Sequence, residues 1–158
     1  MAVITVEDGT GLTTSNSYAT VVEANTYHVD VLNSTAWDAS ADPEAALIMA
    51  TRLLDEKVKW RGSRNSRAQA LRWPRSYVYA NNAIPQWLKN ATAELARWLS
   101  ASDRLAEADT KGYSRMRVAD LELWISKSDR TRVIPPSVWS MISPYGVSLS
   151  AGRMLVRV

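Results

Sequence analysis

The chain has 158 residues, 46% of them hydrophobic and 22% charged, with a formal net charge of +3, a composition typical of a globular protein with a real core. It contains no cysteine and one histidine, which excludes a disulfide framework and a thiol nucleophile and argues against a zinc site. No apolar run approaches the ~20 residues of a membrane span, and residues 1–11 lack a signal-peptide pattern. We expect a soluble, non-enzymatic domain with no cofactor, metal or membrane partner.

Charge is segregated along the chain. Residues 1–51 contain seven acids and no Lys or Arg, whereas residues 52–75 contain eight basic residues against Asp55 and Glu56. The sequence pI of about 9.3 would suit nucleic-acid binding. Such blocks indicate either an internal acid–base match or two faces for different partners. The simpler alternative is that most of these charges are solvated.

The first 41 residues predict one strand and one helix. Residues 3–6 form a β-branched run that stops at the turn-rich sequence 7–11. A helix should begin at Thr20, because Thr20 and Glu23 have the spacing of a capping box. Its apolar face is predicted to comprise Ala24, Tyr27, Val31 and Leu32. Residues 33–41 are small and polar apart from Trp37, which predicts a loop.

A second helix is predicted after Asp42, a good N-cap that is followed by Pro43 at the first helical position. Its core-facing stripe is predicted to comprise Leu47, Ala50, Leu54 and Val58. Gly62 is a suitable residue to end this helix. Residues 61–75 then form a basic connection, in which Pro74 favours an extended backbone at Trp73.

The third predicted helix starts near Pro85 and is the longest. Its buried face is predicted to comprise Leu88, Ala91, Leu95, Trp98, Leu99 and Leu105, with Lys89 and Glu94 outside. Residues 121–125 alternate between apolar and polar side chains with period two, which predicts a strand. The earliest start of this strand is Arg115. Pro135 and Pro136 open a short helix that ends before Pro144, and residues 153–158 resemble a last strand.

These elements predict a mainly α fold. We expect a single domain over residues 1–158, with a three-helix body at about 18–108 and a short helix at about 136–143. β-strand-forming N- and C-terminal extensions would complete it, including an extended arm at about 112–134 and a tail at 146–158. Isolated strands are only marginally stable in water, and their exposed edges favour pairing with another chain. The extensions are therefore expected to become stable by pairing with neighbouring molecules. The alternative is an intramolecular sheet packed on the helices.

No arrangement of residues predicts catalysis. His28 has no cysteine partner and lies beside an apolar helix face, where a satisfied histidine is the simpler interpretation. No Gly-x-Ser-x-Gly, phosphate-loop or EF-hand pattern occurs. The chain contains seven Trp and six Tyr but no Phe. Such aromatics are enriched at interfaces, but they also serve as core residues in place of Phe.

An ordered set of motifs carries a family resemblance. They are EDGTGL at 7–12, NSYATV at 16–21, EAALIMAT at 44–51, WRG at 60–62, QALRWPR at 69–75, IP at 84–85 and ATAELA at 91–96. In this order they resemble the head–tail connector (adaptor, head-completion) proteins of tailed bacteriophages, some of which are labelled DnaT-like single-stranded-DNA-binding proteins. The resemblance covers roughly residues 4–145. Ala119 departs from it where glycine is expected, and the C-terminal tail matches only in character.

The resemblance implies a structural protein of the virion neck that is assembled in the host cytoplasm. It implies a homo-oligomeric ring, commonly a dodecamer, beneath the portal protein. A downstream tail, nozzle or stopper protein would follow, and double-stranded genome DNA would pass through the channel without sequence specificity. The expected subunit and portal interface comprises Trp60, Arg61, Arg72, Trp73, Arg75, Leu121, Leu123, Trp124, Met154, Val156 and Val158.

The basic and aromatic segment 60–75 supports an alternative function, that of a single-stranded-DNA-binding module. Its phosphate contacts would come from Arg61, Arg64, Arg67, Arg72 and Arg75. Trp60 and Trp73 would stack on bases. A structural interpretation of the same segment is also open, in which arginine stacks on tryptophan and proline fixes the turn.

Overall fold

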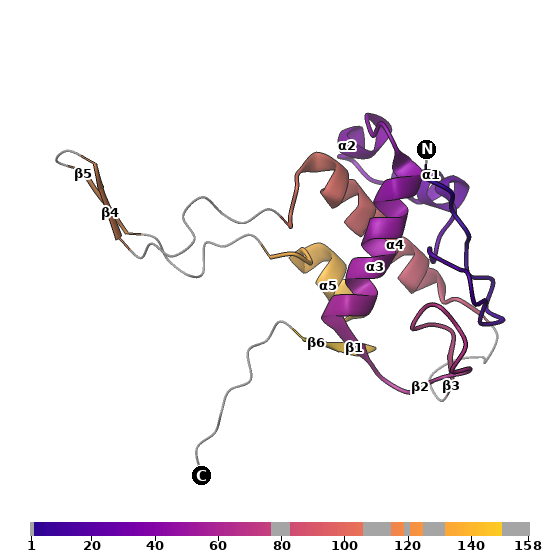
Figure 1. Ribbon diagram of the computed structural model, residues 1–158. Helices are drawn as coiled ribbons and strands as arrows, with labels where there is room; N and C mark the ends of the chain where they lie inside the picture. Colours follow the sequence, from indigo (N-terminus) through magenta and orange to yellow (C-terminus); the bar gives the residue numbers. More distant parts are fainter. Residues whose placement is uncertain (1, 77–82, 106–114, 119–120, 125–131, 150–158) are drawn as a thin grey trace, which may run out of the picture.

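The computed structural model describes residues 2–76, 83–105, 115–118, 121–124 and 132–149. Its helices are α1 (Val21–Val29), α2 (Thr35–Asp38), α3 (Pro43–Lys57), α4 (Gln86–Ala101) and α5 (Pro136–Ile142). Its strands are β1 (Val58–Trp60), β2 (Ser63–Arg64), β3 (Arg75–Ser76), β4 (Arg115–Val118), β5 (Leu121–Trp124) and β6 (Gly146–Ser148). Figure 1 shows the helices gathered into one body, with β4 and β5 lying apart from it.

The expectation of a mainly α, three-helix fold is wrong. The described residues form a mixed α/β structure with five helices and three two-stranded antiparallel sheets, which pair β1 with β6, β2 with β3, and β4 with β5. Residues 35–38, predicted as loop, form α2, and this short helix buries Trp37. Residues 58–60, predicted as helix, instead pair with residues 146–148. Tertiary contacts therefore override the local pattern in both segments.

Helix α4 is the centre of the body, because α1, α2, α3 and α5 all pack against it. Leu88, Ala91 and Leu95 are fully buried, as the predicted apolar face requires. The helix ends at Ala101 rather than continuing, so Leu105 is 45% exposed and lies outside the core to which the sequence assigned it.

Glu94 is buried, which corrects the prediction that it lies on the outer face of the third helix. Its carboxylate accepts hydrogen bonds from Arg97 Nε and Nη2 and from Trp98 Nε1, the last at 3.0 Å. A buried carboxylate needs charged or polar partners, and these two residues supply them from the next turn of the same helix. The i+3 and i+4 spacing of Arg97 and Trp98 is the sequence signal for this burial.

The predicted starts of α1 and α3 are confirmed. Thr20 Oγ1 accepts the Glu23 amide at 3.0 Å while the Glu23 carboxylate accepts the Thr20 amide at 2.8 Å, which completes the capping box. Asp42 accepts the Ala45 amide at 3.0 Å. The predicted stripe on α3 is buried throughout, but the helix ends at Lys57, so Gly62 does not terminate it and lies in a turn at φ +76°.

The N-terminal segment forms a carboxylate-centred loop instead of the predicted strand. Only an isolated bridge links Val6 to Ser17. The Glu7 side chain is 1% exposed, and it accepts hydrogen bonds from the amides of Gly9 (3.1 Å), Gly11 (2.8 Å) and Leu12 (3.0 Å) and from the Ser15 hydroxyl (2.7 Å). Gly9 and Gly11 have positive φ, which lets successive amides turn toward one carboxylate.

The sheet of β1 and β6 closes the body on the side opposite α2 in Figure 1. It pairs Val58 with Ser148 and Trp60 with Gly146. This part of the predicted tail therefore pairs with its own chain, whereas the last predicted strand at 153–158 lies outside the described residues. A Cβ atom at Gly146 would lie 2.5 Å from Val58 Cγ1, so the strand pairing requires glycine there. Among the described residues, no helix is long and apolar enough to cross a bilayer.

Candidate nucleic-acid interface

The candidate interface is the basic loop, by which we mean residues 61–75. It begins where β1 ends, and it contains β2 and the first residue of β3, in a register that places Arg64 opposite Arg75. In Figure 1 it lies beside the indigo N-terminal segment. The amide of Ala70 donates to the Leu12 carbonyl at 2.9 Å, so the Glu7-centred loop supports the basic loop from outside.

Gln69 holds the basic loop from within, and it is only 3% exposed. Its amide nitrogen donates to the carbonyls of Leu71 (2.9 Å) and Pro74 (3.1 Å), and its oxygen accepts the Ser66 amide at 2.9 Å. Sequence reasoning gave Gln69 no role beyond its place in a motif, because its neighbours 66, 71 and 74 meet only once the loop folds. This polar network gives the loop one defined backbone path.

Arg75 is a structural residue of the loop. Its Nε donates to the Arg61 carbonyl at 2.7 Å, and Nη1 donates to the Arg72 carbonyl at 3.0 Å. Its Nη2 donates to the carbonyls of Trp60 and Gly62. Burial lowers the pKa of this guanidinium. Because its donors are committed to backbone carbonyls, Arg75 is the one arginine of the predicted set that the fold itself uses.

The helical body anchors the loop through Tyr18 and Asp55. The Tyr18 hydroxyl donates to Asp55 at 2.6 Å and accepts the Trp73 amide at 3.2 Å, while the other Asp55 oxygen accepts the Arg72 amide at 2.8 Å. Burial raises the pKa of Asp55 to about 6. Burial, followed by the charge of Asp55, raises the pKa of Tyr18. Two side chains of the body thus fix two consecutive amides of the loop.

The two tryptophans of the segment point into the core. Trp60 is 5% and Trp73 1% exposed, their ring centroids lie 5.9 Å apart in an edge-to-face arrangement, and both pack against Trp87. Trp87 in turn stacks on Tyr145 at 4.0 Å. This matches the core alternative for the aromatic excess, and it leaves neither Trp60 nor Trp73 with a ring face for a nucleic-acid base.

Four arginines of the basic loop are exposed. They are Arg61, Arg64, Arg67 and Arg72. The ion pairs found within the described part of the chain involve other cations: Arg52 with Glu56, Lys89 with Glu23, and Arg97 with Glu94. The four guanidinium groups thus lie exposed on one loop, without a salt bridge to any described acid.

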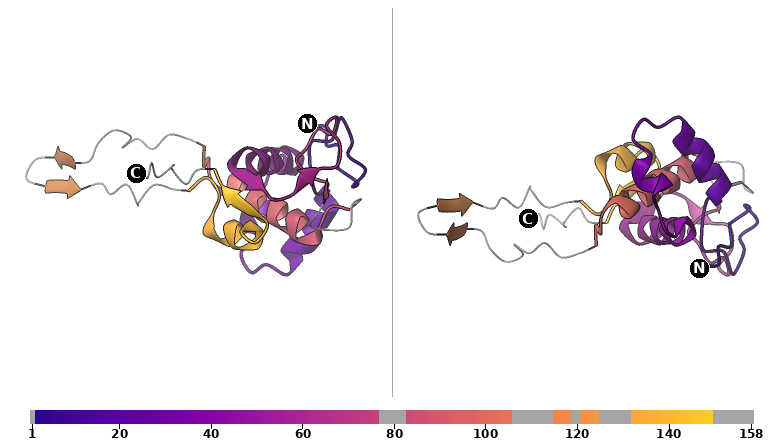
Figure 2. Two further views of the ribbon diagram at one scale, coloured as in Figure 1. Left: turned by 90° about the horizontal axis from the view of Figure 1, so that it is seen from below. Right: turned by 90° about the horizontal axis from the view of Figure 1, so that it is seen from above.

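The structure does not bring the other predicted interface residues to this loop. Leu121, Leu123 and Trp124 belong to β5, which Figures 1 and 2 place well away from the helical body. Met154, Val156 and Val158 lie outside the described residues. The predicted interface is therefore divided among separate parts of the chain.

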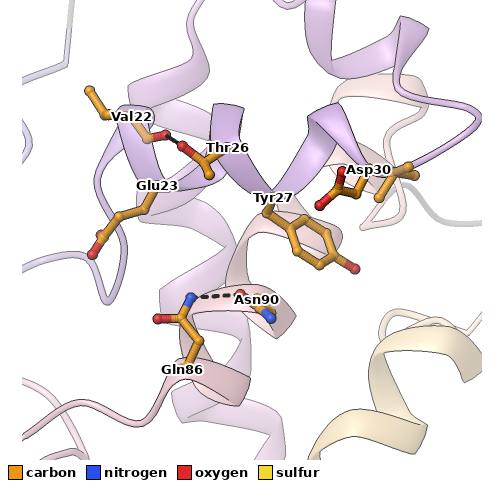
Figure 3. Close-up of a pocket in the computed structure, with 8 residues that line it drawn as sticks. Val22, Glu23, Thr26, Tyr27, Asp30, Gln86 and Asn90 are labelled. Carbon is orange, nitrogen blue, oxygen red and sulfur yellow. Dashed lines mark hydrogen bonds between the residues drawn. The ribbon is translucent and has the colours of Figure 1, made fainter.

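A groove of about 630 Å³ between α1 and α4 was not predicted. It is lined by Val22, Glu23, Thr26, Tyr27, Asp30, Val31, Gln86 and Asn90, and Figure 3 shows the two helices that contribute them. The carboxylate of Glu23 is bound by Lys89 Nζ at 2.6 Å. No group of three or more His, Asp or Glu side chains in the described ranges is placed to hold a metal ion, so the groove presents hydrogen-bonding and apolar groups.

Comparison with known proteins identifies a family. All 158 residues match the family described as "Putative DnaT-like ssDNA binding protein". No curated protein and no solved structure matches the chain significantly. The chain belongs to this DnaT-like family.

Proposed function

We propose that this protein binds single-stranded DNA through phosphate contacts made by Arg61, Arg64, Arg67 and Arg72. The observation that supports this most directly is their exposure on a loop that is internally hydrogen-bonded and carries no salt bridge to a described acid. The family description points in the same direction. The proposed role is binding without catalysis.

The bracing of the loop favours this function energetically. Gln69, Arg75 and Asp55 already fix its backbone, so DNA binding has little loop entropy to overcome. Guanidinium groups bind phosphate oxygens in a bidentate manner. Since Trp60 and Trp73 are buried, we expect affinity to come from charge and counterion release, with little dependence on base sequence.

The test is a fluorescence-anisotropy titration of a labelled oligothymidylate at several salt concentrations. For single strands the slope of log K against log salt is roughly −0.7 per phosphate neutralised, so four contacts predict a slope of about −3. Replacing all four arginines by alanine should remove most of the affinity and flatten the slope. The fold should survive, because only the backbone groups of Arg61 and Arg72 bond to Arg75 and Asp55.

The matched control is Arg52→Ala, which removes an exposed arginine of α3 that pairs with Glu56. It should leave the slope nearly unchanged. If the fourfold variant, folded by circular dichroism, binds with the same affinity and slope as the wild type, the basic loop is not the DNA site.

One observation favours a second function, that of a head–tail adaptor in the neck of a phage particle. Figures 1 and 2 show β4 and β5 as a hairpin held away from the helical body, which suits an arm that reaches a neighbouring subunit or a portal protein. In this role copies would form a ring between portal and tail, with genome DNA passing through it. Electron microscopy of the purified protein, together with the oligonucleotide titration, separates the two functions. Annular particles that do not bind oligonucleotides favour the adaptor, whereas monomers that bind them tightly exclude it.

A further inference from the structure

The groove between α1 and α4 has two walls of different chemistry. Figure 3 shows Gln86 and Asn90 of α4 on one side and Thr26, Tyr27 and Asp30 of α1 on the other. The groove volume of about 630 Å³ lies within the range of roughly 300–1,000 Å³ that is typical of small-molecule sites. A planar ligand of the size of one nucleobase therefore has room between the two walls.

The α4 wall presents two side-chain amides in a fixed orientation. Gln86 Nε2 donates to Asn90 Oδ1 at 2.9 Å, across one turn of the helix. A side-chain amide has two N–H donors and an oxygen with two lone pairs, so this bond leaves the Asn90 nitrogen as a donor and the Gln86 oxygen as an acceptor. The edge of a nucleobase carries a donor and an acceptor side by side, and it is complementary to this amide pair.

The α1 wall supplies an aromatic ring and a carboxylate. Tyr27 is half-buried, and its ring meets that of His28 edge-on, with centroids 5.1 Å apart. Proteins commonly hold the bases of a single strand by stacking them on such rings. Asp30 is exposed at the C-cap of α1. An ionised carboxylate can only accept hydrogen bonds, so Asp30 favours a base with an exocyclic amine over one with a carbonyl at that position.

The charge of the groove favours a base over a phosphate. Two acids line it, and Glu23 is paired with Lys89 Nζ at 2.6 Å. Asp30 has no salt bridge to a cation of the described residues, so its negative charge remains. Like charges repel, which disfavours a phosphate group there and leaves a neutral base unaffected.

Helices α1 and α4 run in the same direction along the groove. The ion pair between Glu23 and Lys89 joins their first turns. Further along both helices, His28 Nε2 lies 3.1 Å from the Ala93 carbonyl oxygen. The N-terminal ends of the two helices therefore lie at the same end of the groove.

That end of the groove adjoins the basic loop. Tyr18, which precedes α1, accepts the Trp73 amide at 3.2 Å through its hydroxyl. Trp87, which follows Gln86 in α4, packs against Trp73 with ring centroids 5.4 Å apart. Both walls of the groove thus begin at residues that contact the loop, so a strand whose phosphates lie along the loop can reach the groove.

We infer that Tyr27, Asp30, Gln86 and Asn90 form a base pocket, which receives one cytosine or adenine of a strand bound by the basic loop. The inference rests on the proposed function, because the loop supplies the phosphate contacts. The loop alone gives little dependence on base identity, and the base pocket adds a preference for bases with an exocyclic amine. It also favours single strands, because a duplex must first unpair the base that enters.

The test compares labelled oligodeoxycytidylate and oligodeoxyuridylate of equal length by fluorescence anisotropy at neutral pH. The two have the same phosphate charge, but cytosine carries an amine at C4 where uracil carries a carbonyl. The wild type should bind the cytidylate about tenfold more tightly, which is the size of discrimination that one good base contact gives. The salt slope should be the same for both oligonucleotides, because the phosphate contacts are unchanged.

Asp30→Asn should remove most of this preference, because an amide can also donate to the carbonyl of uracil. The matched control is Asp38→Asn on α2, which removes an equal charge outside the groove and should keep the tenfold ratio. The double variant Gln86→Ala with Asn90→Ala should lower the affinity for the cytidylate toward that for the uridylate. Alanine favours helix, so α4 should persist, which circular dichroism checks.

NMR signals of the side-chain amides report on the position of the base. The cytidylate should shift the signals of Gln86 and Asn90 more than the uridylate does. Free deoxycytidine should shift them only at much higher concentration, because it lacks the phosphate contacts. If free deoxycytidine binds as tightly as the oligonucleotide, the groove is a site for free nucleosides, which contradicts the inference.

The outcomes keep the two proposals apart. Equal binding of both oligonucleotides, with a salt slope that the fourfold arginine variant loses, would overturn the base pocket and leave the DNA-binding function intact. Binding of neither oligonucleotide would overturn both. A preference for the cytidylate that survives both Asp30→Asn and the Gln86 and Asn90 double variant would place the base elsewhere and overturn the pocket alone.

Discussion

Replacing Asp55 with asparagine should change how the stability of this protein depends on pH. Burial raises the pKa of Asp55 from 3.8 to about 6 in the folded state, so the folded protein binds a proton more tightly there than the unfolded chain does. The stability linked to this proton is fully present below pH 3.8 and is lost as the pH rises through 6. At about 1.4 kcal/mol per pKa unit, the loss is at most about 3 kcal/mol.

The assay is urea unfolding of the wild type and Asp55→Asn at several pH values from 4 to 7. Asparagine does not titrate, so the free energy of unfolding of the wild type should fall relative to the variant by up to about 3 kcal/mol over this range. Other titrating groups occur in both proteins and cancel in the difference. A difference that stays constant from pH 4 to 7 would refute the claim that burial controls the proton affinity of Asp55.

Two further predictions concern the core and the β1–β6 sheet. His28 is 3% exposed and its Nε2 lies 3.1 Å from the Ala93 carbonyl, and burial lowers its pKa below the ordinary 6.5; the wild type should therefore lose stability relative to His28→Gln as the pH falls below 6.5, measured by thermal melts from pH 7.5 to 5. Equal melting shifts of both proteins would contradict this. Gly146→Ala should destabilise by about 1–3 kcal/mol because its Cβ would collide with Val58, whereas Val147→Ala, at a 56% exposed position of the same strand, should unfold at nearly the wild-type urea concentration.

Local signals in the sequence were sufficient for the starts of α1 and α3 and for most core faces. Thr20 and Glu23 cap α1 through contacts three residues apart, and Asp42 caps α3 in the same way. The apolar stripe of α3 is buried as its spacing predicts. Such features depend on neighbours within one or two turns, and the sequence displays those neighbours directly.

Long-range contacts account for the main errors. Residues 58–60 continue the helical apolar stripe, yet they form β1 because residues 146–148 supply strand hydrogen bonds. Leu32 was placed on an apolar helix face, but α1 ends at Val29 and leaves it fully exposed. In the candidate site, the arginine-rich composition of residues 61–75 was visible, whereas the roles of Gln69 and Asp55 depend on residues that only the folded loop brings together.

The amino-acid sequence by itself determined the position of the positive charge, the helix caps and the absence of cysteine chemistry, because these are properties of residue type and short spacing. Only the tertiary structure decided what each arginine and tryptophan does. It buries Trp60 and Trp73 against Trp87 and turns Arg75 toward backbone carbonyls, while Arg61 and Arg67 remain exposed. Burial is a property of the surroundings of a side chain, and those surroundings come from segments distant in the sequence.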